Sequence, residues 1–332
     1  VLVRSNANNQ VNMKGTAALK VDLSGWDDFD AGAIDHLNSF GIHNSNITTT
    51  SGNDRIEGSA TSAINQFELF LDTADLSVNG GGVVDTFIST GSGNDEVFGT
   101  ASGDGLRAAQ GFVDSNVNTG TGNDLVSGGA SGSNFLMGIG DDAINLTASE
   151  GSLLDGGIGN DILRVTGASS NTRLEGGIGK DQLQGGSGDD DLSGGIGSDV
   201  IRGGAGADRF HFTGADMLSG TDKLVDFNGS EGDKILLSSN LTGFEKGTAV
   251  NFVSAAQAQQ AGFNMDQAVI VDSMANIQAM GSVSNSHLAY ATDTGALLYD
   301  ANGDWSQGSR TVAVLNENGK NANLTAANIE IS

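Results

Sequence analysis

The sequence contains no cysteine and no proline among its 332 residues. Without cysteine, no disulfide and no thiolate metal site can form. Any cross-link that stabilises an extracellular fold must then be of another kind, such as a metal ion held by oxygen atoms. Without proline, every residue keeps a backbone N–H that can join a strand ladder. The two absences together suit a chain of stacked strands.

Basic residues are scarce: 15 Lys and Arg stand against 41 Asp and Glu, for a net charge of −26. This balance argues against nucleic acid and anionic membrane surfaces as partners. It suits a cation binder or a solvated surface protein. Long apolar runs are also missing, since runs such as 268–271 fall far below the roughly 20 residues of a membrane helix. We therefore predict no membrane span.

The first four residues, Val1 to Arg4, are neither a Met start nor a signal peptide with a charged end and an apolar core. We therefore expect a mature product or a fragment of a longer chain.

Glycine is abundant, with 51 residues, and much of it lies in a nine-residue repeat, G-G-x-G-x-D-x-U-x, where U is a large apolar residue. Four copies follow one another without a gap at 176–184, 185–193, 194–202 and 203–211, and a fifth covers 156–164. The first six positions predict a turn, because glycine permits positive φ and lets carbonyl oxygens approach an ion. The last three predict a short strand with U pointing inward.

This repeat resembles the calcium-binding repeat of the RTX family. The resemblance covers residues 120–332 well and 50–120 weakly. It implies a secreted bacterial protein that binds several calcium ions, and calcium favours six to eight oxygen ligands. The expected ligands are Asp124, Asp142, Gly157, Gly159, Asp161, Gly177, Gly179, Asp181, Gly186, Gly188, Asp190, Gly195, Gly197, Asp199, Gly204, Gly206 and Asp208, with Asp54, Asp95, Asp300, Asn302 and Asp304 as weaker candidates.

Two repeats make one coil of 18 residues, so Asp181 should stack on Asp199, and Asp190 on Asp208, about 4.8 Å apart. Two carboxylates at that distance repel by roughly 1 kcal/mol in water and by more when buried. Such a column needs cations, which makes the metal part of the fold.

Degenerate copies extend the pattern upstream, because sixth-position Asp residues recur at 124, 142, 161, 181 and 199. We predict calcium turns on one edge of the coil up to about residue 175 and on both edges over 176–211. Asp85 and Asp114 are either remnants of the second edge or ordinary surface acids. The roll is expected to span 51–212, preceded by irregular coils or the end of another domain over 1–50.

Residues 213–332 are expected to close the roll. A capping box at Ser254–Gln257 predicts a short helix with Gly262 as its stop. Strands are predicted at 268–271, 311–315 and 329–331, and a hairpin at 288–292 and 296–299. The predicted fold is all-β: a right-handed parallel β-roll or β-helix solenoid with calcium-binding turns, capped by a C-terminal mixed-β segment with a short helix.

The passage 294–304, followed by 324–329, resembles the C-terminal end of type I secretion substrates. The resemblance implies the type I machinery as a partner and an extracellular or cell-surface location. Within this passage, Asp300, Asn302 and Asp304 also have the alternating spacing of an oxygen-ligand loop, but Thr311 at the twelfth position rules out an EF-hand.

No catalytic constellation is found. The four histidines, His36, His43, His211 and His287, form no H-E-x-x-H motif, and there is no G-x-S-x-G elbow. We therefore predict that this chain is not an enzyme. Two functions remain open: a structural surface protein (surface layer, adhesin or matrix) that assembles with copies of itself, or the C-terminal secretion and folding module of a larger enzyme such as a hydrolase.

Overall fold

The computed structural model describes residues 10–13, 37–39, 46–47, 54–60, 67–73, 76–80, 83–84, 86–91, 93–101, 111–214, 216–260, 263–265, 267–282, 287–317 and 319–332. The chain divides into two compact units, residues 1–177 and 178–332. The residues His36, His43 and Asp85 lie outside the described residues.

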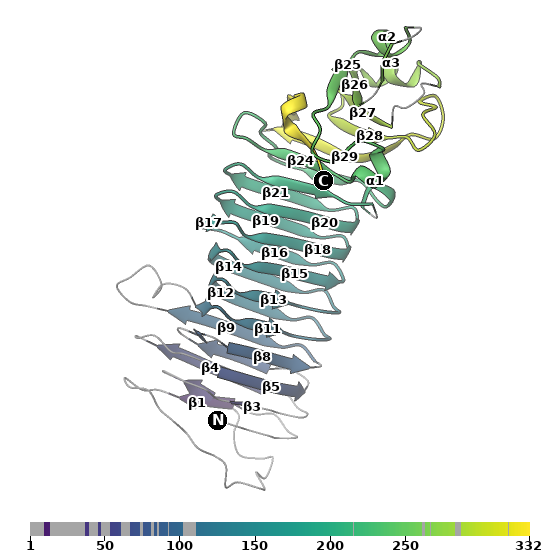
Figure 1. Cartoon of the computed structure of the whole chain (residues 1–332). Helices are drawn as coiled ribbons and strands as arrows, with labels where there is room; N and C mark the ends of the chain where they lie inside the picture. Colours follow the sequence, from purple (N-terminus) through teal and green to yellow (C-terminus); the bar gives the residue numbers. More distant parts are fainter. Residues whose placement is uncertain are drawn as a thin grey trace. The chain divides into compact units, whose positions relative to one another are not determined.

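Unit 1 is built from two parallel ladders of strands (Figure 1). One ladder contains β3 (Asn46–Ile47), β5 (Phe67–Thr73), β8 (Thr86–Gly91), β11 (Asn116–Asn118), β13 (Asn134–Leu136) and β15 (Leu153–Ile158). The other contains β4 (Asp54–Ala60), β6 (Leu76–Gly80), β9 (Glu96–Ala101), β12 (Leu125–Ser131), β14 (Ala143–Glu150) and β16 (Ile162–Val165). The short strands β1 (Gln10–Met13), β2 (Leu37–Ser39), β7 (Val83–Val84), β10 (Phe112–Val113) and β17 (Ser169–Ser170) also pair in parallel.

The parallel register confirms the predicted solenoid. Leu125 lies opposite Ala143, and Ala143 lies opposite Ile162. Equivalent Asp residues of neighbouring coils are accordingly 18 or 19 positions apart. The period read from the Asp spacing is thus the length of one coil.

Unit 2 begins with the tandem repeats. One parallel ladder contains β19 (Gln182–Ser187), β21 (Val200–Ala205), β23 (Asp222–Leu224) and β29 (Arg310–Glu317). The second contains β20 (Asp191–Gly197), β22 (Arg209–Phe212), β24 (Lys234–Leu237) and β31 (Ile329–Ile331). The residues of strand β18 (Arg173–Gly179) belong partly to unit 1 and partly to unit 2, because the division between the units falls after residue 177.

The repeat strands are longer than predicted. β19 begins at the seventh position of one repeat and ends at the third position of the next, and β21 does the same. The prediction that all of the first six positions form the turn is therefore wrong. The two leading glycines remain in the ladder, with Gly186 opposite Gly204, so the turn is confined to positions four to six.

The C-terminal part of unit 2 is the predicted mixed-β cap. The hairpin of β27 (Leu288–Ala291) and β28 (Ala296–Tyr299) is antiparallel, and β28 continues antiparallel onto β29. Two parallel strands, β25 (Asn251–Val253) and β26 (Ala268–Asp272), extend the sheet from β27. The remaining elements are β30 (Lys320–Asn321), α1 (Ser239–Thr242), α2 (Ala255–Ala258), α3 (Met274–Gln278), η1 (Asp216–Leu218) and η2 (Ala326–Asn328).

The capping box at Ser254 is confirmed, because the Ser254 side chain accepts the Gln257 N–H and the Gln257 side chain accepts the Ser254 N–H. The helix is shorter than predicted. It is capped at Gln259, whose N–H already bonds to the carbonyl of Ala255, so the expected stop at Gly262, which lies outside the described residues, is not needed. Helices α1 and α3 were not predicted.

The eighth position of each repeat forms the core. Leu183, Leu192, Ile201 and Phe210 are each at most 2% exposed. Their neighbours alternate with them, as a strand period of two requires. In unit 1, the equivalent residues Val126, Ile144 and Leu163 are fully buried.

This alternation predicts very different costs for adjacent substitutions on β21. Ile201→Ala, at a site 1% exposed, should lower the free energy of unfolding by about 2–5 kcal/mol because it removes buried methyl groups and leaves a cavity. Val200→Ala, at a site 43% exposed, should change it by less than about 0.5 kcal/mol. Denaturant unfolding in saturating calcium measures both, and equal costs would contradict the assigned inward face.

Candidate metal centre

One edge of unit 1 carries a column of buried aspartates. Asp95, Asp124, Asp142 and Asp161 are each at most 2% exposed. In each step, the backbone N–H of one Asp donates to the Oδ1 atom of the Asp one coil later, at 2.8 Å. The structure therefore brings three expected ligands and the weaker candidate Asp95 into one ladder. The side chain of Asp54, another weaker candidate, lies outside the described residues.

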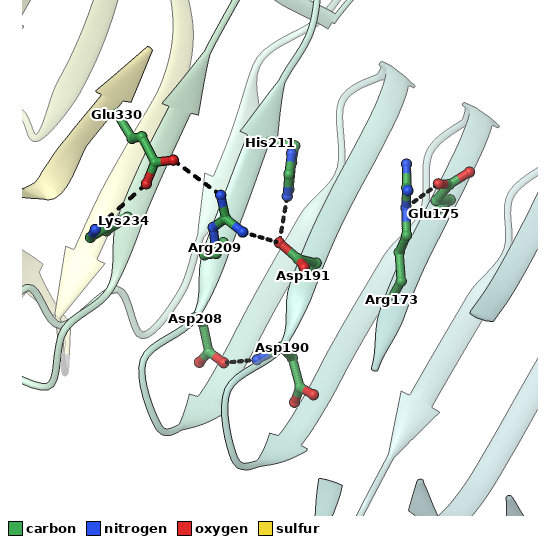
Figure 2. Close-up of polar contacts among 9 residues, drawn as sticks. All are labelled: Arg173, Glu175, Asp190, Asp191, Asp208, Arg209, His211, Lys234 and Glu330. Carbon is green, nitrogen blue, oxygen red and sulfur yellow. Dashed lines mark hydrogen bonds and ion pairs between the residues drawn. The ribbon is translucent and has the colours of Figure 1, made fainter. Parts of the chain in front are cut away.

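Unit 2 carries two such ladders, one on each edge. The Asp181 N–H donates to Asp199 Oδ1 at 2.8 Å. On the other edge, the Asp190 N–H donates to Asp208 Oδ1 at 3.0 Å, and Figure 2 shows this second bond. The predicted stacking is present, but it is mediated by a hydrogen bond from the backbone. One oxygen of each carboxylate is thus engaged by the preceding coil.

Both ladders of unit 2 continue past the repeats. Asp199 N–H donates to Asp222 Oδ1, and Asp208 N–H donates to Asp233 Oδ1, each at 3.0 Å. Neither Asp222 nor Asp233 was among the expected ligands. The sequence does contain a pattern that could have identified them: each Asp is followed two positions later by an apolar residue, which is buried, as in the repeats.

The second carboxylate oxygen of the ladder residues is the unusual feature. The Oδ2 atoms of Asp142, Asp199 and Asp208 are buried and accept no hydrogen bond. Burial, together with the charge of neighbouring carboxylates, raises the pKa of Asp142 to about 7 and that of Asp208 to about 7. Burial likewise raises the pKa of Asp222 to about 8. Buried, unneutralised carboxylates of this kind call for a cation.

Backbone carbonyls form columns beside the aspartates. A Cβ atom built on Gly197 would lie 1.6 Å from the carbonyl oxygen of Gly179, and one on Gly204 would lie 1.8 Å from that of Gly186. Only glycine lets the coils approach this closely. The second- and fourth-position carbonyls of a repeat are thus stacked against the equivalent positions of the repeat one coil away.

The first-position glycine has a separate role. A Cβ atom on Gly203 would lie 2.2 Å from Asp208 Oδ2, and one on Gly194 would lie 2.5 Å from Asp199 Oδ2. This glycine therefore leaves room over the carboxylate of its own repeat.

Four glycines of unit 1 belong to the same pattern and were not among the expected ligands. Gly120, Gly122, Gly138 and Gly140 have φ values of 90°, 136°, 99° and 154°. They occupy the second and fourth positions of two further repeats, 119–127 and 137–145, in which only the first glycine is replaced, by Thr119 or Met137. Reading the template from its second position would have found them.

The opposite edge of unit 1 uses serine where the first edge uses aspartate. Ser115 N–H donates to Ser133 Oγ at 3.1 Å, and Ser133 N–H donates to Ser152 Oγ at 3.2 Å. All three serines are buried. A hydroxyl carries no charge, so this edge has the same backbone bond without a buried anion. Asp114 lies at this edge but is exposed, and the ladder position beside it belongs to Ser115.

The donor set favours calcium. Within the described residues, no three His, Cys, Asp or Glu side chains gather around one point. An ion between coils would therefore take carboxylate oxygens together with stacked carbonyl oxygens. Calcium accepts six to eight such oxygens at about 2.3–2.6 Å, whereas zinc sites favour nitrogen and sulfur. The orphaned Oδ2 atoms and the glycine-lined carbonyl columns fit this ion.

The three consecutive acids of the second tandem repeat have three different environments. Asp189 Oδ1 accepts the Ala207 N–H, and Asp190 is part of the ladder. Asp191 faces outward, where His211 Nε2 lies 2.6 Å from its Oδ1 atom and Arg209 lies 3.8 Å away. His211 is thus a hydrogen-bond partner of Asp191 on the outer side of the sheet.

Glu330 of β31 joins the same outer network (Figure 2). It pairs with Arg209 of β22 at 3.1 Å and with Lys234 of β24 at 3.5 Å. The acids Asp191 and Glu330 therefore find basic partners on the outer side of the sheet.

Protein donors occupy the ends of the two ladders in unit 2. The Arg310 guanidinium donates to the carbonyls of Leu218 and Gly220, which precede Asp222. Asn328 Nδ2 donates to the carbonyls of Gly229 and Asp233, at 3.1 and 3.0 Å. The last turns thus bond to side chains of the cap.

The comparisons with known proteins agree with this geometry. A family model described as RTX calcium-binding nonapeptide repeat matches residues 166–201 and 184–216. No curated protein matches the chain. No helix in the described part of the chain is both long and apolar enough to cross a membrane.

The raised pKa values predict how acid acts on the calcium-free fold. These carboxyls hold protons more tightly when folded than when unfolded, so their contribution to stability is complete below the unfolded pKa near 4. It is lost as the pH rises through the folded values of about 7 for Asp142 and Asp208. In EDTA, far-UV circular dichroism should therefore show more strand at pH 5 than at pH 8. Less strand at pH 5 would contradict the assignment.

The carbonyl columns predict a strict requirement for glycine. Gly197→Ala should abolish calcium binding at the adjoining coils, because its Cβ would lie 1.6 Å from the Gly179 carbonyl oxygen. Ile196→Ala, at the neighbouring exposed position, is the matched control and should bind the full number of ions. Calorimetric titration counts the ions, and equal stoichiometry in the two variants would count against the columns.

Proposed function

We propose that this chain, whose RTX nonapeptide repeats bind calcium, is a secreted structural component of a bacterial cell surface, such as a surface layer, an adhesin or an extracellular matrix. It folds and assembles on extracellular calcium after type I export. The observation that carries the proposal is the set of buried Asp ladders, in which the Oδ2 atoms of Asp142, Asp199 and Asp208 accept no hydrogen bond. A fold that buries so many like charges depends on its ions.

Each ion would lie between successive coils. In unit 2, one edge offers Gly186, Gly188 and Asp190 with Gly204, Gly206 and Asp208 from the next coil. The other edge offers Gly179, Asp181, Gly195, Gly197 and Asp199. The equivalent positions in unit 1 are those of Gly157, Gly159, Asp161, Asp142 and Asp124. Gly177 and Asp95 occupy positions of the same kind and are assigned the same role as ligands. When bound, calcium supplies the positive charge that the ladder lacks.

The charge of the chain supports the link between export and folding. With a net charge of −26, the unfolded chain repels itself where calcium is scarce. Outside the cell, calcium reaches roughly millimolar levels, the range to which extracellular sites are tuned. Folding would then coincide with arrival at the surface.

A row of exposed apolar residues supports an assembling role. Ile139 and Ile158, both at third positions, are 53% and 48% exposed and lie next to each other through a parallel bridge. In unit 2, Ile178 and Ile196 hold the same position and are also exposed. Aligned exposed apolar side chains of this kind mark contact surfaces, and a neighbouring copy of the chain would cover them.

The second candidate is the C-terminal secretion and folding module of a larger secreted enzyme. It is supported by the cap, in which the predicted hairpin of the secretion-like passage is present as β27 and β28. A catalytic domain encoded directly upstream of Val1 would favour this candidate. We propose the same internal division for both: a roll over 51–212 and a cap with the export signal over 213–332.

Calcium should switch both folding and assembly. In calcium, far-UV circular dichroism should report strand, and electron microscopy should show ordered sheets or filaments. In EDTA at pH 8, both signals should disappear, because the ladder carboxylates lose their counter-charge.

The two readouts separate the parts of the proposal. Strand content that is identical in EDTA and in calcium would remove the calcium basis of the fold. A folded monomer in calcium, at every concentration tested, would remove the assembling role and favour the module.

A further inference from the structure

A second type of acidic site lies in the cap, away from the repeats. Asp300 follows β28 and is 1% exposed. Its Oδ1 atom accepts the backbone N–H groups of Asn302 and Gly303, at 2.9 and 2.8 Å. Its Oδ2 atom is buried and accepts no hydrogen bond. The carboxylate thus points into its own loop with one oxygen unused.

This environment is the one found in the calcium repeats. Asp142, Asp199 and Asp208 also combine a buried carboxylate, an Oδ1 atom bonded to backbone N–H, and an orphaned Oδ2 atom. None of the ion pairs among the described residues involves Asp300 or Asp304. Among the described residues, no basic side chain therefore forms an ion pair that would neutralise the carboxylates of Asp300 and Asp304.

Side-chain oxygens alternate along the loop after Asp300. Asn302 Oδ1 accepts the Asp304 N–H at 2.7 Å. Asp304 Oδ1 accepts both the N–H and the hydroxyl of Ser306, at 3.2 and 2.6 Å. Carboxylate and amide oxygens retain further lone pairs after one such bond, so they remain available to a cation.

The ends of the loop are anchored to neighbouring segments. Asp300 N–H donates to the His287 carbonyl at 3.0 Å, and His287 Nδ1 lies 2.8 Å from the Asp300 carbonyl oxygen. The Trp305 N–H donates to the Gly281 carbonyl at 3.1 Å, and Trp305 itself is 1% exposed. A loop fixed at both ends holds its oxygens in place before an ion arrives.

We propose that residues 300–306 bind one calcium ion of their own, with Asp300, Asn302 and Asp304 as side-chain ligands. The hard oxygen donors select calcium over metals that prefer nitrogen or sulfur. The ion neutralises the buried Asp300 carboxylate and fastens the loop beside the hairpin of β27 and β28. This site is separate from the Asp ladders and goes beyond the function proposed for the roll.

Terbium luminescence tests the site, because Tb³⁺ replaces Ca²⁺ at oxygen sites and emits when a nearby indole transfers its excitation. The chain has two tryptophans, Trp26 and Trp305, and residues 51–212 contain no Trp or Tyr. In a Trp26→Phe background, Trp305 is the lone indole, so emission excited at the red edge of its absorption reports on the cap loop. We expect a saturable signal that calcium displaces.

Two variants in the same background identify the ligands. Asp300→Asn should lose most of the sensitised emission and bind one calcium fewer, because it replaces the orphaned oxygen by an amide. Glu245→Gln, which removes an exposed acid elsewhere in unit 2, is the control and should keep both. If Asp300→Asn does not fold in calcium, as judged by circular dichroism, Asp304→Asn takes its place.

Absence of indole-sensitised emission from the folded Trp26→Phe chain would overturn the site, whatever the variants do. So would emission from folded Asp300→Asn equal to that of the control. Failure of the roll is a different outcome, because it appears as calcium-independent circular dichroism rather than as lost indole-sensitised emission.

Discussion

The structure depends on one bond, from the backbone N–H of a sixth-position residue to the side-chain oxygen of its equivalent one coil later. In unit 2 this bond fixes Asp199 under Asp181 and Asp208 under Asp190. It takes one oxygen of each carboxylate and draws the whole group into the turn, where the other oxygen has no protein donor in Asp199 or Asp208. The bond that aligns the coils therefore also buries the carboxylate for which a cation would supply the counter-charge.

Unit 1 separates these two effects. Its Asp edge and its Ser edge belong to the same coils and use the same backbone bond, 2.8 Å at Asp124 and 3.1 Å at Ser115. Only the Asp edge buries charge. The same bond is thus present with a neutral hydroxyl as acceptor and with a carboxylate as acceptor, and only the carboxylate brings a buried charge that a cation would neutralise. The prediction that only one edge of this region carries calcium turns stays a prediction, and the Ser edge gives a physical reason for it.

Much of this arrangement could be predicted from sequence, because a fixed spacing maps directly onto position in a coil. The 18-residue period placed Asp199 under Asp181, and the apolar eighth position identified Ile201 and Phe210 as core. What escaped prediction has physical reasons. Ser133 has no distinctive neighbours in the sequence, and its role appears only when coils are stacked. The ladder steps to Asp222 and Asp233 span 23 and 25 residues, so a search at the repeat period passes over them.

The ends of the ladders show a third way to meet the same demand. Carbonyls of the last turn have no following coil, and Arg310 and Asn328 bond to them from distant parts of the cap. A guanidinium brings positive charge without any metal, and an amide brings a donor without charge. Along the ladders, the backbone N–H of a turn thus bonds to a serine hydroxyl or to a carboxylate, and the carbonyls of the last turns bond to side chains of the cap. Which kind of side chain is present at a given turn determines whether that turn buries a carboxylate, and therefore whether that turn has a reason to bind an ion.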